Sequence, residues 1–319
     1  MKLRYFFTCI SSFLLLANVS LAQQDVPLSQ FMFNKVYYNP AYSGVEGLTK
    51  FTALHRTQWA GYNTTFDGNG GNPVTQMLTM NTALLKMSSG VGFYVVNDRL
   101  GPQSNLEIQG SFAYHLRVGD SKLSFGVRAG AFSQTIDFDQ YRAVNPDDPL
   151  LGSGKETQIR PDLSIGAWFQ HEDFYIGVSS AHITEAEFDF NVESLRNPIK
   201  THLYLMGGYD YDLNYDFTVT PSILVRTDLV QYSFDLAVLG TYKEKMYAGL
   251  SYRQEEAIIA MLGYSFLKEN AMKVGYAFDY IVSEQSAKQA TSHEIMLSYT
   301  LPVLPPAAKK VIRTPRFRH

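Results

Sequence analysis

The sequence has almost no cysteine: a single one, Cys9, occurs among 319 residues. It lies in an N-terminal stretch that we expect to be removed, so the mature chain has no disulfide and no cysteine for a lipid anchor. A secreted chain without disulfides is unlike a small cross-linked extracellular module. Its stability is better explained by a closed sheet whose strands are hydrogen-bonded throughout.

Charged residues and long apolar runs are also scarce. Only 18% of the residues are charged and the formal net charge is −3, which is too weak to indicate nucleic-acid binding. After residue 22 no apolar run is long enough to cross a membrane as a helix. A transmembrane β-barrel remains compatible with this composition, because half of each of its strands faces a polar lumen.

The chain begins with the pattern of a secretory signal peptide. Lys2 and Arg4 precede an apolar stretch at 6–17, and residues 20–22 (SLA) have the small side chains of a cleavage site. We therefore expect residues 1–22 to be removed, so that the protein leaves the cytoplasm.

Acidic and basic residues are distributed unevenly along the chain. Two of the 27 basic residues lie in the leader and five in the last eleven residues, whereas all 30 acidic residues lie between 23 and 308. The body is therefore acidic, while the tail at 302–319 is basic and rich in proline, which favours an extended conformation.

The remaining sequence alternates between apolar and polar residues with a period of two, which is typical of strands. Leu106, Ile108 and Phe112, for example, alternate with Glu107 and Gln109. This pattern predicts fourteen strands, most of them close to the roughly 9–11 residues that a tilted strand needs to cross a bilayer. We place them near 48–58, 73–83, 90–97, 104–117, 122–132, 161–169, 173–181, 201–210, 216–226, 231–240, 246–253, 257–264, 271–279 and 292–301.

The connections between these strands differ in length. In the first half, predicted long loops at 59–72, 98–103, 133–160 and 182–200 alternate with short turns. Short periplasmic turns and long extracellular loops are typical of outer-membrane barrels. The sequence thus predicts an all-β fold, an antiparallel transmembrane β-barrel. A soluble β-sandwich or lectin-like barrel is the alternative, which alternation alone does not exclude. The predicted organisation is a signal peptide at 1–22, a periplasmic N-terminal segment and possible plug at 23–47, the barrel at 48–301 and the periplasmic tail at 302–319.

Motifs for catalysis or metal binding are absent from the sequence. Residues 152–156 (GSGKE) resemble the end of a phosphate loop, but they lack its first glycine and its metal-binding Ser or Thr. The pair His293-Glu294 has no second histidine four residues later. Asp137 and Asp139 are not followed by the glycine and glutamate of a calcium loop. We therefore expect no enzyme, no cofactor and no metal site.

An ordered set of motifs resembles the PorP/SprF family of outer-membrane proteins from type IX secretion and gliding systems. It begins with the motifs at 29–34 (SQFMFN), 38–44 (YNPAYSG) and 56–59 (RTQW), and it ends with 275–280 (GYAFDY) and 292–299 (SHEIMLSY). Between them lie 101–102 (GP), 113–116 (AYHL), 175–180 (YIGVSS), 202–209, 221–224 (PSIL) and 249–253 (GLSYR), and the tail at 314–317 (TPRF) also fits.

The resemblance implies a fourteen-stranded barrel in the cell outer membrane, without enzymatic activity. It further implies a role in the secretion, or the cell-surface anchoring, of an adhesin with a type B C-terminal domain. An alternative is a machinery subunit that connects the barrel to periplasmic ring and peptidoglycan-binding proteins. A porin-like channel is a third interpretation, in which lumen charges such as Glu107, Lys122, Arg128, Asp162 and Arg253 set the selectivity.

Two groups of residues are candidate binding sites. Polar, acidic and aromatic residues in the long loops are candidates for binding the adhesin, since loops on a rigid scaffold commonly carry binding functions. They are Asp137, Asp139, Tyr141, Asp147, Asp148, Glu185, Glu187, Phe188, Asp189 and Phe190. Candidates for docking periplasmic components lie near the two ends of the chain, at Phe31, Phe33, Tyr38, Asn39, Pro40, Pro315, Arg316 and Phe317. The expected partners are the adhesin, periplasmic type IX components and outer-membrane lipid, but no nucleic acid.

Overall fold

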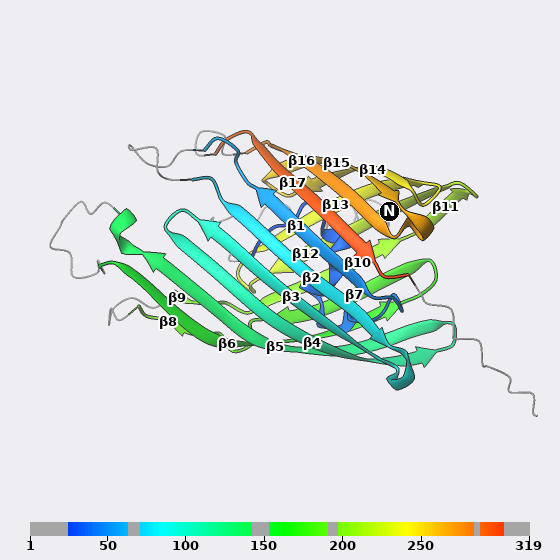
Figure 1. Ribbon diagram of the computed structural model, residues 1–319, viewed down its shortest axis with the longest axis horizontal. Helices are drawn as coiled ribbons and strands as arrows, with labels where there is room; N and C mark the ends of the chain where they lie inside the picture. The colour runs from blue at the N-terminus through cyan, green and yellow to red at the C-terminus, as the bar shows by residue number, and fades with distance from the viewer. Residues whose placement is uncertain (1–24, 63–70, 142–152, 191–196, 284–287, 303–319) are drawn as a thin grey trace, which may run out of the picture.

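The computed structural model describes residues 25–62, 71–141, 153–190, 197–283 and 288–302. These residues form a closed antiparallel barrel of fourteen strands, which confirms the predicted fold (Figure 1). The first and last strands, β1 and β17, pair to close the barrel, and all other neighbours are consecutive barrel strands, with β10 pairing directly with β12. The barrel strands are β1 (Lys50–Thr57), β2 (Val74–Leu84), β3 (Ser89–Leu100), β4 (Gln103–Val118), β5 (Ser121–Asp137), β6 (Lys155–Gln170), β7 (Phe174–Ala181), β10 (His202–Tyr209), β12 (Phe217–Thr227), β13 (Tyr232–Tyr242), β14 (Met246–Arg253), β15 (Ala257–Phe266), β16 (Met272–Ile281) and β17 (Thr291–Thr300).

Smaller elements complete the described chain. Strand β11 (Tyr211–Asn214) pairs with one end of β12, and β8 (Glu187–Phe188) pairs with β9 (Asn197–Pro198) outside the barrel sheet. The short helices are η1 (Phe31–Phe33), α2 (Lys35–Tyr38), η2 (Pro40–Tyr42), η3 (Leu85–Met87), η4 (Phe138–Gln140) and η5 (Lys268–Asn270). No helix in this part of the chain is long and apolar enough to cross a membrane.

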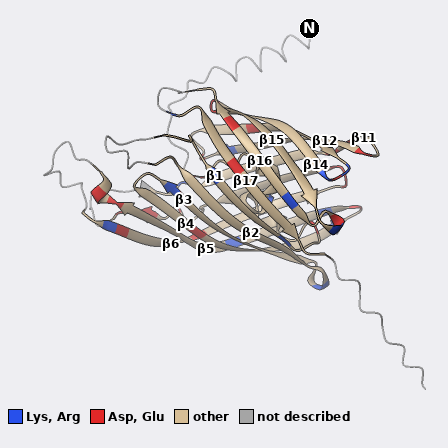
Figure 2. Cartoon of the chain, turned by 45° about the horizontal axis from the view of Figure 1, so that its top comes forward, with Lys and Arg blue, Asp and Glu red and all other residues tan. Residues whose placement is uncertain are grey.

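The strands direct apolar side chains outward and polar side chains inward, which is the reverse of a soluble sandwich. On β4, the apolar Ile108 is 44% exposed, whereas the neighbouring Glu107 and Gln109 are 5% and 1% exposed. The same inversion recurs on β13, where Val238 is exposed and Asp235 is fully buried. Apolar side chains that point outward suit a surrounding lipid phase, and polar side chains that point inward suit a filled lumen. Long stretches of the strands carry no Lys, Arg, Asp or Glu (Figure 2).

Three predicted loops differ from the structure. The expected loop at 98–103 is a tight turn at 101–102, because β3 continues to Leu100 and β4 begins at Gln103. Strand β5 extends to Asp137 and β6 begins at Lys155, so much of 133–160 is strand. The segment 182–200 contains the β8–β9 pair. These strand ends are mostly polar in sequence, so the apolar alternation that marks a strand is missing there.

The N-terminal segment at 25–47 occupies the inside of the barrel (Figure 1, dark blue). Its apolar side chains, such as Leu28, Phe31 and Tyr38, are at most 1% exposed and belong to the principal buried cluster. The rest of that cluster comes from inward-facing residues of the strands, including Trp168 and Met206. The core of this protein is therefore the interface between the segment and the barrel wall.

Candidate functional site

The lumen-filling segment, residues 25–47, runs along the length of the barrel. Asp25 contacts His182 and His202, which lie at one end of β7 and β10. Gly44 donates its backbone N–H to Asn81 on β2, 2.6 Å away, close to the opposite end, where the chain then enters β1. Because the strand β1 starts at the end that carries the short turns, we assign that end as periplasmic and the Asp25 end as extracellular.

A buried network of charges holds residues Ser29 and Gln30. Glu294 accepts the backbone N–H groups of both, at 2.7 and 2.9 Å. The Ser29 hydroxyl donates to Asp279 at 2.7–2.8 Å and accepts from Arg56. Arg56 in turn forms an ion pair of 2.8 Å with Asp279, and both side chains are at most 1% exposed. Buried charges are stable only when they are paired and hydrogen-bonded, and the segment supplies part of that pairing.

Arg253 connects this network to the preceding residue of the segment. Its guanidinium donates to the Leu28 carbonyl at 2.9 Å and to Asp235 at 3.0 Å. Arg226 also pairs with Asp235, at 3.2 Å, and the Arg253 side chain is only 1% exposed. Arg253 therefore acts as a bridge between the barrel wall and the segment backbone.

Three inward-facing cations share this way of binding the segment. Arg128 donates to the Val36 carbonyl at 2.5 Å and Lys122 to the Val45 carbonyl at 2.7 Å, as Arg253 does to Leu28. An irregular segment placed inside a protein has carbonyls that lack sheet or helix partners, and these must be satisfied. Three of the five lumen charges named from the sequence thus bind the segment backbone.

The periplasmic half of the segment is held by close packing instead. Gly126 and Gly90 face the segment, and a Cβ on either would overlap the backbone of Pro40 to Ala41 or of Ser43 to Gly44. Asn39 donates to carbonyls of Ala167 and Val178 at 3.0 and 3.1 Å. The absence of side chains at these strand positions is what lets the two backbones approach each other.

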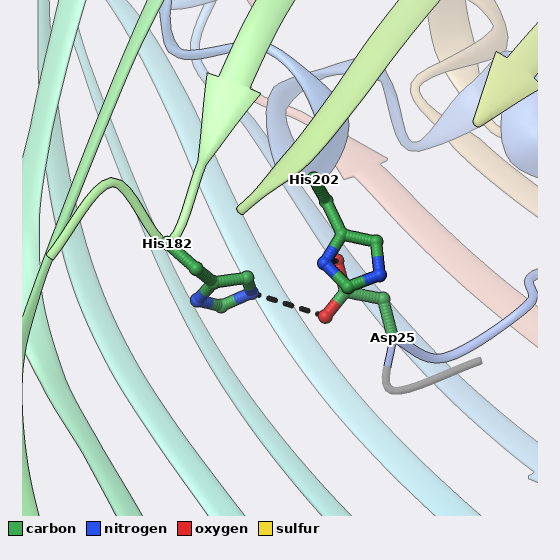
Figure 3. Close-up of side chains that lie close together, drawn as sticks. All are labelled: Asp25, His182 and His202. Carbon is green, nitrogen blue, oxygen red and sulfur yellow. Dashed lines mark hydrogen bonds and ion pairs between the residues drawn. The ribbon is translucent and has the colours of Figure 1, made fainter. Parts of the chain in front are cut away.

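A second polar cluster lies at the extracellular end, around Asp25, His182 and His202 (Figure 3). His182 Nε2 is 3.0 Å from an Asp25 oxygen, and His182 Nδ1 is 3.2 Å from Asp162. Burial by itself would lower the pKa of His182, but the carboxylates of Asp25 and Asp162 outweigh it and raise that pKa well above its ordinary value. Burial likewise works against an ionised Asp25, yet His202 and His182 hold its pKa below the usual range.

The predicted docking residues of the N-terminal segment are covered in this structure. Phe31, Tyr38, Asn39 and Pro40 are buried inside the barrel, and Phe33 is half-buried against the Tyr247 ring, with centroids 4.9 Å apart. A periplasmic partner would reach them only if the segment left the lumen, so their docking role stays a prediction. The tail residues Pro315, Arg316 and Phe317 lie outside the described residues.

The predicted adhesin-binding loops meet at the extracellular end. Phe138 after β5 packs on Phe190, with ring centroids 6.3 Å apart, and Phe188 packs on Phe132 at 5.9 Å. Phe188 and Phe190 are fully buried in this small cluster, so they support the loops rather than face solvent. The acidic candidates Asp139, Glu185, Glu187 and Asp189 and the ring of Tyr141 are exposed, Asp137 is half-buried, and Asp147 and Asp148 lie outside the described residues.

Sequence reasoning named Lys122, Arg128 and Arg253 as lumen charges, but it did not select the other residues that bind the segment. Asp25, Arg56, Asp279 and Glu294 were not candidate site residues, although the last three lie in the family motifs at 56–59, 275–280 and 292–299. One signal was available: a charged side chain on the small or polar face of a strand is directed into the lumen and requires a partner there. Applied to each strand, that rule selects Arg56, Asp279 and Glu294.

Comparison with known proteins agrees with this architecture. Solved structures with similar folds include the toluene transporter TbuX of Ralstonia pickettii, which is 12% identical and superposes with a TM-score of 0.51, over 83% of this chain and 92% of that one. The toluene transporter TodX of Pseudomonas putida is 10% identical with a TM-score of 0.47, covering 83% and 92% of the two chains. Omp33 of Acinetobacter baumannii is 8% identical with a TM-score of 0.44, covering 80% and 100%.

At these identities the likeness to TbuX concerns the fold alone, that of an outer-membrane barrel. No curated protein is significantly similar to the sequence. A family match, in contrast, covers residues 20–299, from the end of the predicted leader to the last barrel strand. The protein therefore lies in the cell outer membrane, and the chain belongs to the family described as type IX secretion system membrane protein PorP/SprF.

Proposed function

We propose that the protein is a non-enzymatic outer-membrane scaffold that supports secretion, or cell-surface anchoring, of an adhesin with a type B C-terminal domain. The family membership gives the secretion system, and the filled lumen favours a scaffold over a channel. The carrying observation is that Lys122, Arg128 and Arg253 donate to carbonyls of the lumen-filling segment. In an open porin these cations would face water and permeating ions.

The extracellular side offers a supported binding surface. The buried rings of Phe138, Phe188 and Phe190 join two loops that are far apart in sequence. Around them, Glu185 and Asp189 are exposed, and Asp189 is fixed by Gln158 at 2.7 Å. Acidic groups on a supported loop suit a partner domain with a basic or hydrogen-bond-donating face.

The proposal is tested by charge reversal at this surface. We expect the double variant Glu185→Lys/Asp189→Lys to fold but to retain less adhesin at the cell surface, because like charges would then oppose the partner's face. Asp173→Lys, on an exposed periplasmic turn, is the matched control. The readout is pull-down of the tagged protein from solubilised outer membrane, with partners identified by mass spectrometry.

Two outcomes would contradict the proposal. Unchanged adhesin recovery by the double variant, together with recovery of periplasmic ring or peptidoglycan-binding proteins, would favour the machinery subunit. A steady conductance of the purified barrel in a planar bilayer would favour the porin-like channel, since a barrel filled by its own segment should be nearly silent.

A further inference from the structure

We propose that Asp25, His182 and His202 form a binding site for a divalent transition-metal ion of the zinc class, which joins the lumen-filling segment to the barrel wall. The three residues each offer a ligand atom, and these atoms lie within 4.8 Å of one another. All three side chains are at most 8% exposed. The site does not depend on the proposed role in adhesin binding.

The three ligands come from three separate parts of the chain. Asp25 belongs to the lumen-filling segment, His182 follows β7 and His202 begins β10. The backbone of His182 has a positive φ of 55°, which is uncommon for a residue other than glycine. The rings and the carboxylate converge on one place inside the extracellular mouth of the barrel (Figure 3).

The surrounding contacts are those that orient metal ligands. Metal-binding histidines usually donate their second ring nitrogen to a carboxylate or a carbonyl. His182 has this arrangement: Nε2 faces Asp25 at 3.0 Å while Nδ1 faces Asp162 at 3.2 Å. Asp162 is itself fixed by Gln109 at 2.8 Å. The Tyr204 hydroxyl donates to the Asp25 oxygen that is turned away from His182.

Charge balance independently favours a cation here. Asp25, Asp162 and Glu107 are three carboxylates at most 8% exposed, all close enough to act electrostatically on His182. On the same side Arg128 lies against the Tyr94 ring, and the Tyr94 hydroxyl donates to Glu107 at 3.0 Å. Three buried carboxylates call for positive charge at this place. A proton on His182 meets part of that demand without a metal, and a divalent ion bound in place of the proton would meet more of it.

The donor set selects the kind of metal. Two imidazoles and one carboxylate suit zinc or a similar ion, whereas calcium and magnesium prefer oxygen ligands alone. His202 Nδ1 now lies 2.9 Å from the Lys200 carbonyl and 4.0 Å from Asp25. Binding through Nδ1 requires the proton on Nε2 and gives up the contact with Lys200.

The experiment uses the mature full-length barrel with a tag that contains no histidine, purified in detergent and stripped with EDTA. ZnCl₂ is titrated by calorimetry, and bound metal is counted by elemental analysis. We expect one zinc ion per chain, unaffected by excess CaCl₂. His182→Gln and Asp25→Asn should weaken binding at least 100-fold, and Asp162→Asn about 10- to 100-fold as expected for an outer-shell partner.

His171→Gln is the matched control, because His171 is a partly exposed histidine, 3.8 Å from Asp173, at the other end of the barrel. It should bind zinc as the wild type does. Heat-modifiable migration on gels reports whether each variant is folded. Folded His182→Gln and Asp25→Asn proteins that bind zinc as tightly as the wild type would overturn the proposal.

A second measurement needs no variant. Cobalt(II) added to the stripped wild-type protein should give the visible absorption of a four-coordinate nitrogen and oxygen site, and zinc should displace it. A spectrum of six-coordinate aqueous cobalt at all concentrations would overturn the proposal, and the cluster would then be an ion pair between a protonated His182 and its two carboxylates.

Discussion

The two halves of the lumen-filling segment are attached to the barrel by different physical means. Residues 25–30 are held by buried charges, from Asp25 through Ser29 to Gln30. Residues 39–44 are held by backbone packing against glycines of the wall, with few charges involved. Attachment by charge is strong but depends on every ionic partner being present. Attachment by packing depends on the wall having glycines, without side chains, where the segment backbone approaches it. The difference predicts that the two halves respond to different mutations.

The largest effect should come from Arg253→Ala. It leaves the buried Leu28 carbonyl without its donor and leaves Asp235 with Arg226 alone, and removal of one partner from a buried ion pair typically costs about 3–5 kcal/mol. We expect residues near Leu28 to become sensitive to protease while residues near Pro40 stay protected. Urea unfolding of the barrel in detergent measures the loss.

Lys243→Ala is the control for Arg253→Ala, because the Lys243–Asp216 pair is about half exposed on both sides. Its stability should change by about 0–1 kcal/mol. Equal losses in the two variants would mean that the buried network does not hold the segment.

Ser29→Ala tests one hydrogen-bonded member of the same half. The substitution removes the hydroxyl that donates to Asp279 and accepts from Arg56 but leaves the backbone bonds to Glu294. We expect a loss of about 1.5–3 kcal/mol, the range for hydrogen bonds to charged groups. Hydrogen exchange of the segment should rise near residue 29 and remain low near residue 41; a uniform rise would show that the halves are not independent.

Gly126→Ala tests the other half. The added methyl group would overlap the backbone of Pro40 and Ala41, and overpacking of this kind costs about 1–3 kcal/mol. Gly110→Ala is the matched control, since a Cβ there meets only one atom, at 3.9 Å. Protease sensitivity should appear near Pro40 first. If Gly110→Ala destabilises the barrel as much, the close approach at Gly126 is not what matters.

The smallest expected effect is that of Tyr247→Phe. The Tyr247 hydroxyl donates to the Gln30 side chain at 2.9 Å, where the charged half ends. Loss of one neutral hydrogen bond should cost about 0.5–1.5 kcal/mol, measured again by urea unfolding. A loss as large as that of Arg253→Ala would contradict the ranking of charged above neutral contacts.

The prediction of the fold from sequence succeeded because each strand is read locally. Successive side chains of a strand alternate between its two faces, as in 104–117, so the residues that share a face can be identified without knowing the neighbouring strands. The predicted ends of β5 and β6 were less accurate, because these strands continue to the loop cluster around Phe138 and Phe188. There, packing between distant loops decides what is strand.

The candidate site was less predictable for a similar reason. The motif at 29–34 was recognised as a family feature, but its partners Asp279 and Glu294 lie about 250 residues away in sequence. Phe31 and Tyr38 were docking candidates in a segment that was also predicted as a possible plug, and the structure places them in the lumen. The sequence around an aromatic residue looks the same whether its side chain fills the lumen or faces a partner in the periplasm.

The sequence by itself determined the strands, their number, their inward and outward faces and the family, because these depend on local alternation and on ordered motifs. Only the tertiary structure decided that residues 25–47 fill the lumen and that Asp25, His182 and His202 converge. Closure of the sheet through β1–β17 encloses the segment, and the pairing of β7 with β10 sets the two histidines beside it. The closed barrel decides which inward-facing charges pair with one another, and the sequence of a single strand does not show these pairs.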